Sequence, residues 1–162
     1  MVGVKYLPHL ILAVSAGALG TAYVAQYAFG LEPCTLCLYQ RVPYWVTAAL
    51  GLGAMMTPVG GLRRTMAAAA GIVFLVGAGI AFYHVGVEQH WWLSAVCESS
   101  IESGLSVEQL AERLMKTPPH PCDQINWSLF GISMATYNSA VSLILGAATL
   151  AGAYLLRGTG SR

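Results

Sequence analysis

Long apolar runs separated by polar segments dominate the pattern along the chain. The hydrocarbon core of a bilayer is about 30 Å thick, and a helix of about 20 apolar residues crosses it at about 1.5 Å per residue. The pattern therefore predicts an all-α membrane protein, folded as a single domain over residues 1–162. The four expected membrane-spanning helices of this bundle lie at about 6–29, 41–57, 65–87 and 128–156.

Two polar connections lie on one side of such a bundle, a short one at about 30–40 and a long one at about 88–127. Within the long connection, the segment from Ser106 to Lys116 places apolar residues on one helical face and charged residues on the other. Ser106 is a plausible N-cap for it. We therefore predict a short amphipathic helix, which lies either in the membrane interface or in a solvated loop.

Composition and charge agree with a membrane location. Hydrophobic residues make up 56% of the chain and charged residues 9%, whereas about 25% of residues are charged in ordinary soluble domains. The first run continues beyond the length of about 7–15 residues that a secretory signal core would have, so we read it as a span. The net charge of +1 and the lack of a basic patch with interleaved aromatic residues give no indication of nucleic-acid binding.

The basic residues predict an orientation. If the four runs alternate across the membrane, the two termini and the connection at 57–65 share a face that carries no acidic residue. Short loops rich in Lys and Arg stay in the cytoplasm, so both termini are expected there, and the connections at 30–40 and 88–127 are expected on the oxidising outer side. The basic residues of the cytoplasmic face are Lys5, Arg63, Arg64, Arg157 and Arg162.

Cys34 and Cys37 form a Cys-Thr-Leu-Cys motif before the second run. Two intervening residues suit a small-ring disulfide or half of a metal site. If the helix begins near this pair, Cys37 lies in its first turn, where free backbone N–H groups and the helix dipole favour an anion. Arg41 lies one turn further on the same face, and its charge would lower the pKa of Cys37. Cys37 is therefore a candidate thiolate. The alternative role for Arg41 is that its side chain extends toward the lipid headgroups and serves no site.

Cys97 and Cys122 lie in the long outer connection with 24 residues between them. A disulfide joining them would either staple this loop or take part in redox chemistry. A zinc site made by all four cysteines is disfavoured, because zinc motifs usually pair two Cys-x-x-Cys units, so we expect no metal. Two cysteine pairs facing an oxidising compartment indicate a relay that passes electrons from one pair to the other by thiol–disulfide exchange.

Such a relay needs a final electron acceptor. The sequence has no haem-attachment motif, flavin fingerprint or iron–sulfur spacing, which leaves a lipid-soluble quinone by elimination. His84, near the outer end of the third run, is a candidate for the quinone site, with interfacial packing as the alternative. We interpret Glu88 first as a solvated loop carboxylate, with a proton carrier as the alternative.

Several segments resemble the DsbB family of bacterial disulfide bond formation proteins. The resemblance covers nearly the whole chain, because the four runs, the two cysteine pairs and the arginine after the first pair all agree with the family. It is closest in four segments, which read PCTLCLYQR at 33–41, YHVGVE at 83–88, PCD at 121–123 and WSLFGISM at 127–134.

The resemblance implies an enzyme of the bacterial inner membrane that re-oxidises a periplasmic thiol oxidase of the DsbA type and passes electrons to the membrane quinone pool, ubiquinone or menaquinone. In that family scheme the partner's thiolate attacks Cys97, and Cys122 then exchanges with Cys34. Cys37 faces the quinone, and Arg41 stabilises its thiolate or the negative charge that develops on the quinone. All four cysteines are then catalytic.

Two other interpretations remain. A relative of vitamin K epoxide reductase is also a small helical, quinone-linked thiol enzyme, but its active Cys-x-x-Cys is expected on the last helix, and the run at 128–156 has no cysteine. A non-catalytic membrane scaffold would use its disulfides only to hold the long connection. The long connection varies in length within the family, and a sister group serves dedicated partners, so the identity of the thiol oxidase stays open.

Overall fold

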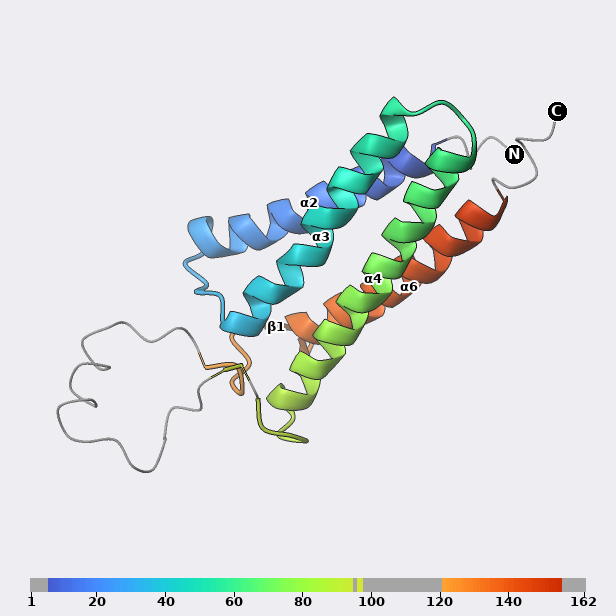
Figure 1. Cartoon of the computed structure of the whole chain (residues 1–162). Coiled ribbons are helices and arrows are strands. Elements are labelled where there is room, and N and C mark those ends of the chain that lie inside the picture. The colour runs from blue at the N-terminus through green and yellow to red at the C-terminus, as the bar shows by residue number, and fades with distance from the viewer. Residues whose placement is uncertain (1–5, 95, 98–120, 156–162) are drawn as a thin grey trace, which may run out of the picture.

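The described part of the chain is a helical bundle with one small hairpin. A computed structural model describes residues 6–94, 96–97 and 121–155. Figure 1 shows long helices running side by side, with the hairpin at one end of the bundle. The elements are α2 (Leu7–Ala28), α3 (Thr35–Met56), α4 (Gly61–Glu88), β1 (Ser128–Leu129), β2 (Ile132–Ser133) and α6 (Met134–Leu155).

Three helices have the character of membrane spans. α2, α4 and α6 are long and apolar enough to cross a membrane, which confirms the runs expected near 6–29, 65–87 and 128–156 as apolar helices of spanning length. α3 has the same length as α2, 22 residues, but polar side chains and an internal proline occupy its first half. A membrane crossing by α3 therefore stays a prediction.

The start of α3 differs from the expected span. The helix begins at Thr35, six residues before the predicted start at 41, so most of the expected loop at 30–40 is helical. Cys34 has an extended backbone, and its sulfur accepts a hydrogen bond from the backbone N–H of Cys37 at 3.2 Å. Because a side-chain acceptor at this position satisfies one of the free N–H groups of the first turn, Cys34 acts as the N-cap of α3. Cys37 accordingly lies in the first turn.

The start of the last helix also differs. α6 begins at Met134, because residues 128–133 form the antiparallel hairpin of β1 and β2. At its turn, Phe130 and Gly131 have positive φ values of 51° and 76°, which a helix does not allow. The turn is apolar in sequence, and so the prediction extended the span too far, to 128. The all-α expectation holds for the described residues apart from this hairpin.

Glycines that contact leucines on the neighbouring helix let α4 and α6 pack closely. A Cβ atom added to Gly71 would lie 2.7 Å from Leu150, and one added to Gly146 would lie 2.6 Å from Leu75, so α4 and α6 approach each other closely. α4 packs mainly against α6 and α3, whereas α2 packs mainly against α3. Since lipid is as apolar as a leucine side chain, close packing of this kind is a main source of stability for membrane helices.

One end of the bundle carries basic residues, and the other carries the cysteines. The start of α2, the connection from α3 to α4 and the end of α6 lie at one end (Figure 1). Arg63 and Arg64 are in the first turns of α4 at this end, and the cysteines are at the other. This arrangement agrees with the expected orientation, which stays a prediction. The amphipathic helix expected at 106–116 lies outside the described residues.

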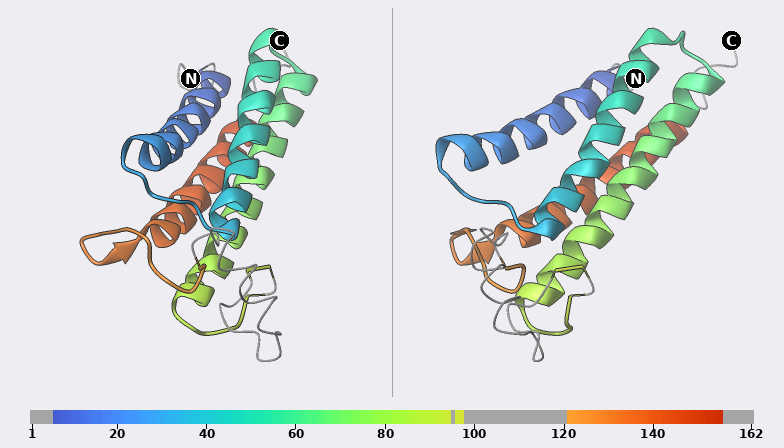
Figure 2. Two further views of the ribbon diagram at one scale, coloured as in Figure 1. Left: turned by 90° about the vertical axis from the view of Figure 1, so that its left-hand side faces the viewer. Right: turned by 60° about the vertical axis from the view of Figure 1, so that its left-hand side comes forward.

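α2 leans away from α6 at the cysteine end. Both views in Figure 2 show the end of α2 separated from the start of α6, with the link from Ala28 to Thr35 crossing between them. α2 makes few contacts with α4 or α6. The bundle is therefore tight between α3, α4 and α6, and it opens on the side of α2.

Replacing Gly71 with alanine tests the close approach of α4 and α6. The new methyl group would collide with Leu150, so we expect G71A to be less stable than G79A by about 1–3 kcal/mol. Gly79 is the matched control, because it lies on the same helix with nothing within 4 Å of its would-be Cβ. Both changes gain the same helix propensity. Equal thermal unfolding midpoints in detergent would contradict the packing described above.

Candidate active site

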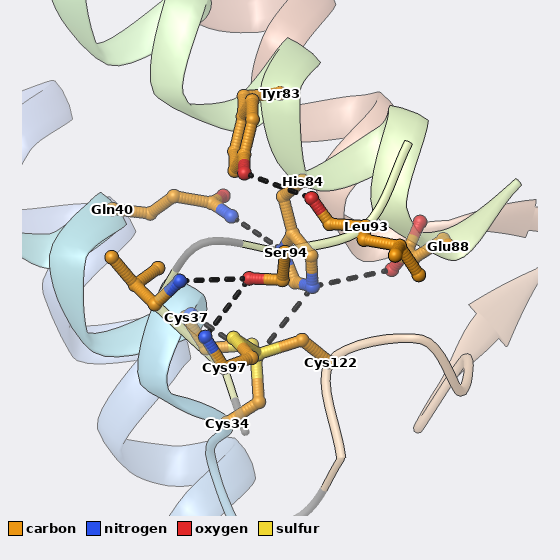
Figure 3. Close-up of a disulfide and its surroundings, with 11 residues drawn as sticks. Cys34, Cys37, Gln40, Tyr83, His84, Glu88, Leu93, Ser94, Cys97 and Cys122 are labelled. Atoms are coloured by element: carbon orange, nitrogen blue, oxygen red, sulfur yellow. Dashed lines mark hydrogen bonds and ion pairs between the residues drawn. A yellow bond between two sulfur atoms is a disulfide. The ribbon is translucent and has the colours of Figure 1, made fainter. Parts of the chain in front are cut away.

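The structure brings all four cysteines together. Cys97 and Cys122 form a disulfide with a Cα–Cα distance of 6.1 Å, while Cys34 and Cys37 are free thiols whose sulfur atoms lie 2.7 Å apart. Cys34 and Cys122 are buried in one cluster, against which Cys37 and Cys97 pack (Figure 3). A dithiol and a disulfide that are distant in sequence are thus neighbours in space.

The segment carrying Cys97 is held against the end of α4. Trp92 donates a hydrogen bond from Nε1 to the backbone oxygen of Tyr83 at 3.0 Å, and its ring lies where a side chain on Gly86 would be. The Ser94 hydroxyl then accepts the backbone N–H of Cys97 at 2.9 Å. These contacts place Cys97 beside the start of α3.

The segment carrying Cys122 is tied to the link between α2 and α3. Asn126 donates a side-chain hydrogen bond to the backbone oxygen of Glu32 at 2.7 Å, across 94 positions of sequence. Because Glu32 is two residues before Cys34, this bond holds the two segments side by side. The disulfide therefore lies next to the cap of α3.

The two thiols of the dithiol are not equivalent. Cys34 donates a hydrogen bond to the sulfur of Cys37, and this bond, together with burial, raises the pKa of Cys34. The same bond lowers the pKa of Cys37, since it stabilises the thiolate that accepts it, and burial opposes this effect. Arg41 also lowers the pKa of Cys37, but it is the smallest of the contributions. Negative charge is therefore most stable on Cys37, mainly because of Cys34.

His84 on α4 points at the dithiol. Its Nε2 lies 3.6 Å from the sulfur of Cys34, and its Nδ1 lies 2.7 Å from the amide nitrogen of Gln40. An amide nitrogen only donates, so Nδ1 accepts, and the hydrogen of the neutral imidazole is on Nε2. The hydrogen bond from Asn138 to the Gln40 side-chain oxygen sets the orientation of the Gln40 amide. This orientation in turn places the N–H group of His84 on Nε2, which faces Cys34.

A chain of hydrogen bonds fixes the Gln40 amide. The Asn138 amide nitrogen donates to the side-chain oxygen of Gln40. The side-chain oxygen of Asn138 in turn accepts from the Tyr44 hydroxyl at 2.6 Å and from the Ser142 hydroxyl at 3.2 Å. We call Gln40, Asn138, Tyr44 and Ser142 the amide chain. None of them was predicted, although polar side chains inside apolar runs are the signal that marks such residues.

Glu88 is buried, so its interpretation as a solvated loop carboxylate was wrong. Only 8% of it is exposed. The Ser133 hydroxyl donates to its Oε2, and its Oε1 lies 3.9 Å from Nε2 of His84. The physical reason is that α4 extends to Glu88 while the hairpin folds back over its end, which the sequence pattern did not indicate.

A pocket of about 430 Å³ borders the dithiol on the side of α2. Its wall is mostly apolar, and Cys37, Arg41 and His84 all line it. Arg41 donates a hydrogen bond to Gln26 at 2.7 Å and stacks over the ring of Tyr23 at 4.9 Å. Its guanidinium group is therefore held by α2 at the pocket wall. We call this hollow between α2, α3 and α6 the apolar pocket.

A family model described as disulfide bond formation protein DsbB matches residues 5–152. The chain belongs to the DsbB family. As a DsbB protein with three apolar helices of spanning length, it is a bacterial inner-membrane protein of disulfide bond formation and has an oxidoreductase role.

Individual relatives agree with the family assignment. Disulfide bond formation protein B of Aromatoleum aromaticum is 33% identical over 79% of this chain and 79% of its own length. That of Xanthomonas campestris pv. campestris is 34% identical over 76% and 74%. An uncharacterized protein of Rickettsia prowazekii is 31% identical over 87% and 83%. No solved structure matches the chain.

The unequal thiols of this DsbB protein predict how alkylation depends on pH. Because the pKa of Cys37 is lowered, we expect iodoacetamide to modify reduced Cys37 at pH values below the pKa of an ordinary thiol, about 8.5. Cys34 should stay protonated and unmodified under the same conditions. Mass spectrometry of the modified cysteines across a pH series measures both.

Two variants separate the causes of the lowered pKa. C34A removes the hydrogen bond to Cys37 and should shift its alkylation profile to higher pH. R41M should shift the profile less, because Arg41 contributes less than Cys34. A larger shift in R41M than in C34A would contradict the assignment of the thiolate's main support to Cys34.

Proposed function

We propose that the chain is a thiol:quinone oxidoreductase that re-oxidises a periplasmic thiol oxidase of the DsbA type and passes the electrons to membrane quinone. The observation that carries this proposal is the arrangement around Cys34. The disulfide of Cys97 and Cys122 packs against the dithiol, and the apolar pocket is lined by both cysteines of the dithiol and by neither cysteine of the disulfide. Electrons entering at the disulfide thus have a short route to the pocket.

The first exchange takes place at the disulfide. The partner's thiolate attacks Cys97, the bond between Cys97 and Cys122 breaks, and a mixed disulfide forms. The partner's second thiol then resolves it, so that the partner leaves oxidised and Cys97 and Cys122 are left as thiols. Exposure supports the choice of Cys97, because it is half-buried whereas Cys122 is buried.

A surface for the partner lies next to Cys97. A hollow of about 250 Å³ is lined by both cysteines of the disulfide and by neighbouring aromatic residues. Trp91 and Leu93 are 60% and 90% exposed there. Exposed apolar side chains of this kind are typical of a surface that binds another protein.

The second exchange transfers the electrons to the dithiol. When Cys34 and Cys37 are themselves joined in a disulfide, the Cys122 thiolate attacks Cys34, and Cys37 leaves as the thiolate. Cys97 then attacks Cys122, which restores the first disulfide and leaves Cys34 reduced. The lowered pKa of Cys37 supports its role as leaving group, since a more acidic thiol leaves faster.

The apolar pocket fits a quinone. Ligand pockets of about 300–1,000 Å³ with mostly apolar walls and a few polar groups are typical of small-molecule sites, and this one is about 430 Å³. Cys37, Arg41 and His84 would hold the ring at its polar edge. A bound quinone would supply a two-electron acceptor for the dithiol. Arg41, fixed by Gln26 and Tyr23, supplies a preorganised positive charge there.

Quinone reduction by the purified protein tests the proposal. With a reduced DsbA-type partner and a soluble ubiquinone or menaquinone analogue, we expect partner-dependent loss of quinone absorbance. C34S, C37S, C97S and C122S should each abolish this turnover. Full turnover in C34S would contradict the proposal. Disulfides that do not react with the partner would favour the alternative of a non-catalytic membrane scaffold.

Loss of the Arg41 charge is expected to slow the reaction with quinone without abolishing it. R41M should lower kcat/KM for quinone by at least about tenfold, or about 1.4 kcal/mol, because the charge at the pocket wall is lost. R64M is the matched control, since Arg64 lies at the opposite end of the bundle. An equal loss in both variants would show that the effect is not specific to the pocket.

The amide chain predicts a further variant. N138L removes the donor to the Gln40 side-chain oxygen and the acceptor of the Tyr44 hydroxyl, which keeps only Ser142 as its partner. Loss of the Gln40 partner costs about 1–3 kcal/mol in stability. We expect slower exchange between the disulfide and the dithiol, because the His84 N–H group loses its fixed direction. S139A is the neighbouring control, with one weak hydrogen bond at 3.3 Å. Unchanged exchange rates in N138L, measured by stopped flow, would contradict this role.

A further inference from the structure

Three potential metal ligands meet at the dithiol. The sulfur atoms of Cys34 and Cys37 and a ring nitrogen of His84 all lie within 4.8 Å of one another. Cys34 and His84 are buried, and Figure 3 shows their side chains directed toward each other from different segments. Two thiols and an imidazole in this arrangement match the ligand types that bind zinc in proteins.

We propose that the reduced dithiol and His84 form a binding site for a thiophilic divalent cation, with Zn²⁺ as the fitting ion. The ion binds only the reduced form, because the disulfide of Cys34 and Cys37 offers no thiolate. While bound, it holds both sulfur atoms and prevents their exchange with Cys122. The site would thus make the protein sensitive to free zinc on the outer side of the membrane.

The distances fit a tetrahedral ion after a small movement. Zn–S bonds of about 2.3 Å and Zn–N bonds of about 2.0–2.1 Å place S and N about 3.6 Å apart and two S atoms about 3.8 Å apart. Cys34 Sγ and His84 Nε2 are already 3.6 Å apart. The two sulfur atoms, 2.7 Å apart, must separate by about 1 Å. Cys37 is half-buried beside the apolar pocket, so its side chain has room to turn.

The amide chain can support the metal-bound histidine. An ion on Nε2 requires the hydrogen of the imidazole to be on Nδ1, where it needs an acceptor. Gln40 provides one if its amide turns over, and Asn138 then turns in the same way to accept from Gln40. Tyr44, at the end of the chain, has a hydroxyl that accepts as well as donates. The same residues therefore form hydrogen bonds with both tautomers of His84, the one with its hydrogen on Nε2 and the one with its hydrogen on Nδ1.

The remaining coordination position faces the pocket. Cys37, His84 and Glu88 all line it, and a carboxylate oxygen of Glu88 lies 3.9 Å from His84 Nε2. Water from the pocket or Glu88 completes the four ligands. Each thiol that is still protonated loses its proton on binding, and His84 only moves its proton between ring nitrogens. Binding thus releases at most two protons per ion and transfers no electrons.

Cobalt is a direct probe of this site. The full-length C97S/C122S protein, reduced with a phosphine under inert gas, has only the Cys34 and Cys37 thiols. We expect one Co²⁺ per chain, with thiolate-to-cobalt charge-transfer bands and the strong visible bands of a tetrahedral site, and displacement of Co²⁺ by Zn²⁺. Failure to bind Co²⁺ stoichiometrically would overturn the proposal.

Variants identify the ligands. In the same background, C37S should lose the charge-transfer bands, and H84A should weaken binding and change the visible spectrum. Q40M should weaken binding by about 10–100-fold, as loss of an outer-shell partner typically does. H9A is the matched control, because His9 is exposed near the start of α2. Equal affinity and spectra in H84A and H9A would overturn the assignment of His84.

A second measurement uses the unaltered protein and does not depend on how the variants fold. Zn²⁺ should protect reduced Cys37 from iodoacetamide, and a chelator should restore its modification. Unchanged alkylation in the presence of Zn²⁺ would overturn the site. Metal binding requires no quinone or partner protein, so its failure leaves the proposed function intact, and failure of quinone turnover leaves the metal site intact.

Discussion

The hydrogen bonds of Cys34 join the start of a helix to the chemistry of the site. Its sulfur accepts the Cys37 backbone N–H that would otherwise be unpaired at the beginning of α3, and its thiol stabilises negative charge on the Cys37 sulfur. Because one side chain does both, the helix fixes the geometry of the dithiol. The position of the disulfide also depends on Cys34, since Cys122 packs in the same buried cluster.

The polar groups of the bundle are stable because they are paired with one another. In an apolar interior an unpaired amide or hydroxyl costs several kcal/mol. The amide chain avoids this cost by joining α3 to α6, and Gln40 extends it to His84 on α4. The same bonds set the direction of the His84 ring. Stability and site geometry therefore have a common origin here, in contrast to the apolar contacts between α4 and α6, which only hold the helices together.

The space between α2 and the other helices makes the dithiol accessible from the apolar pocket. α3, α4 and α6 pack closely, whereas α2 leans away from α6 and leaves the apolar pocket next to Cys37. Arg41 would be costly in this setting if it were unpaired, and Gln26 and Tyr23 on α2 hold it. The dithiol thus contacts both the disulfide and the apolar pocket, as the proposed passage of electrons from the disulfide to a quinone requires.

The apolar helices, the placement of both cysteine pairs at one end and the position of Cys37 in a first turn could be predicted from the sequence, because these features follow from local composition and spacing. The burial of Glu88 and the pairing of His84 with Gln40 follow only from the way the helices pack, because the partners lie 44 or more positions apart in sequence. The hairpin before α6 is local, since Ser128 pairs with Ser133, but its apolar turn concealed it from the hydrophobic pattern. Periodicity indicates which face of a helix is apolar, but it does not specify which polar side chain on another helix will meet it.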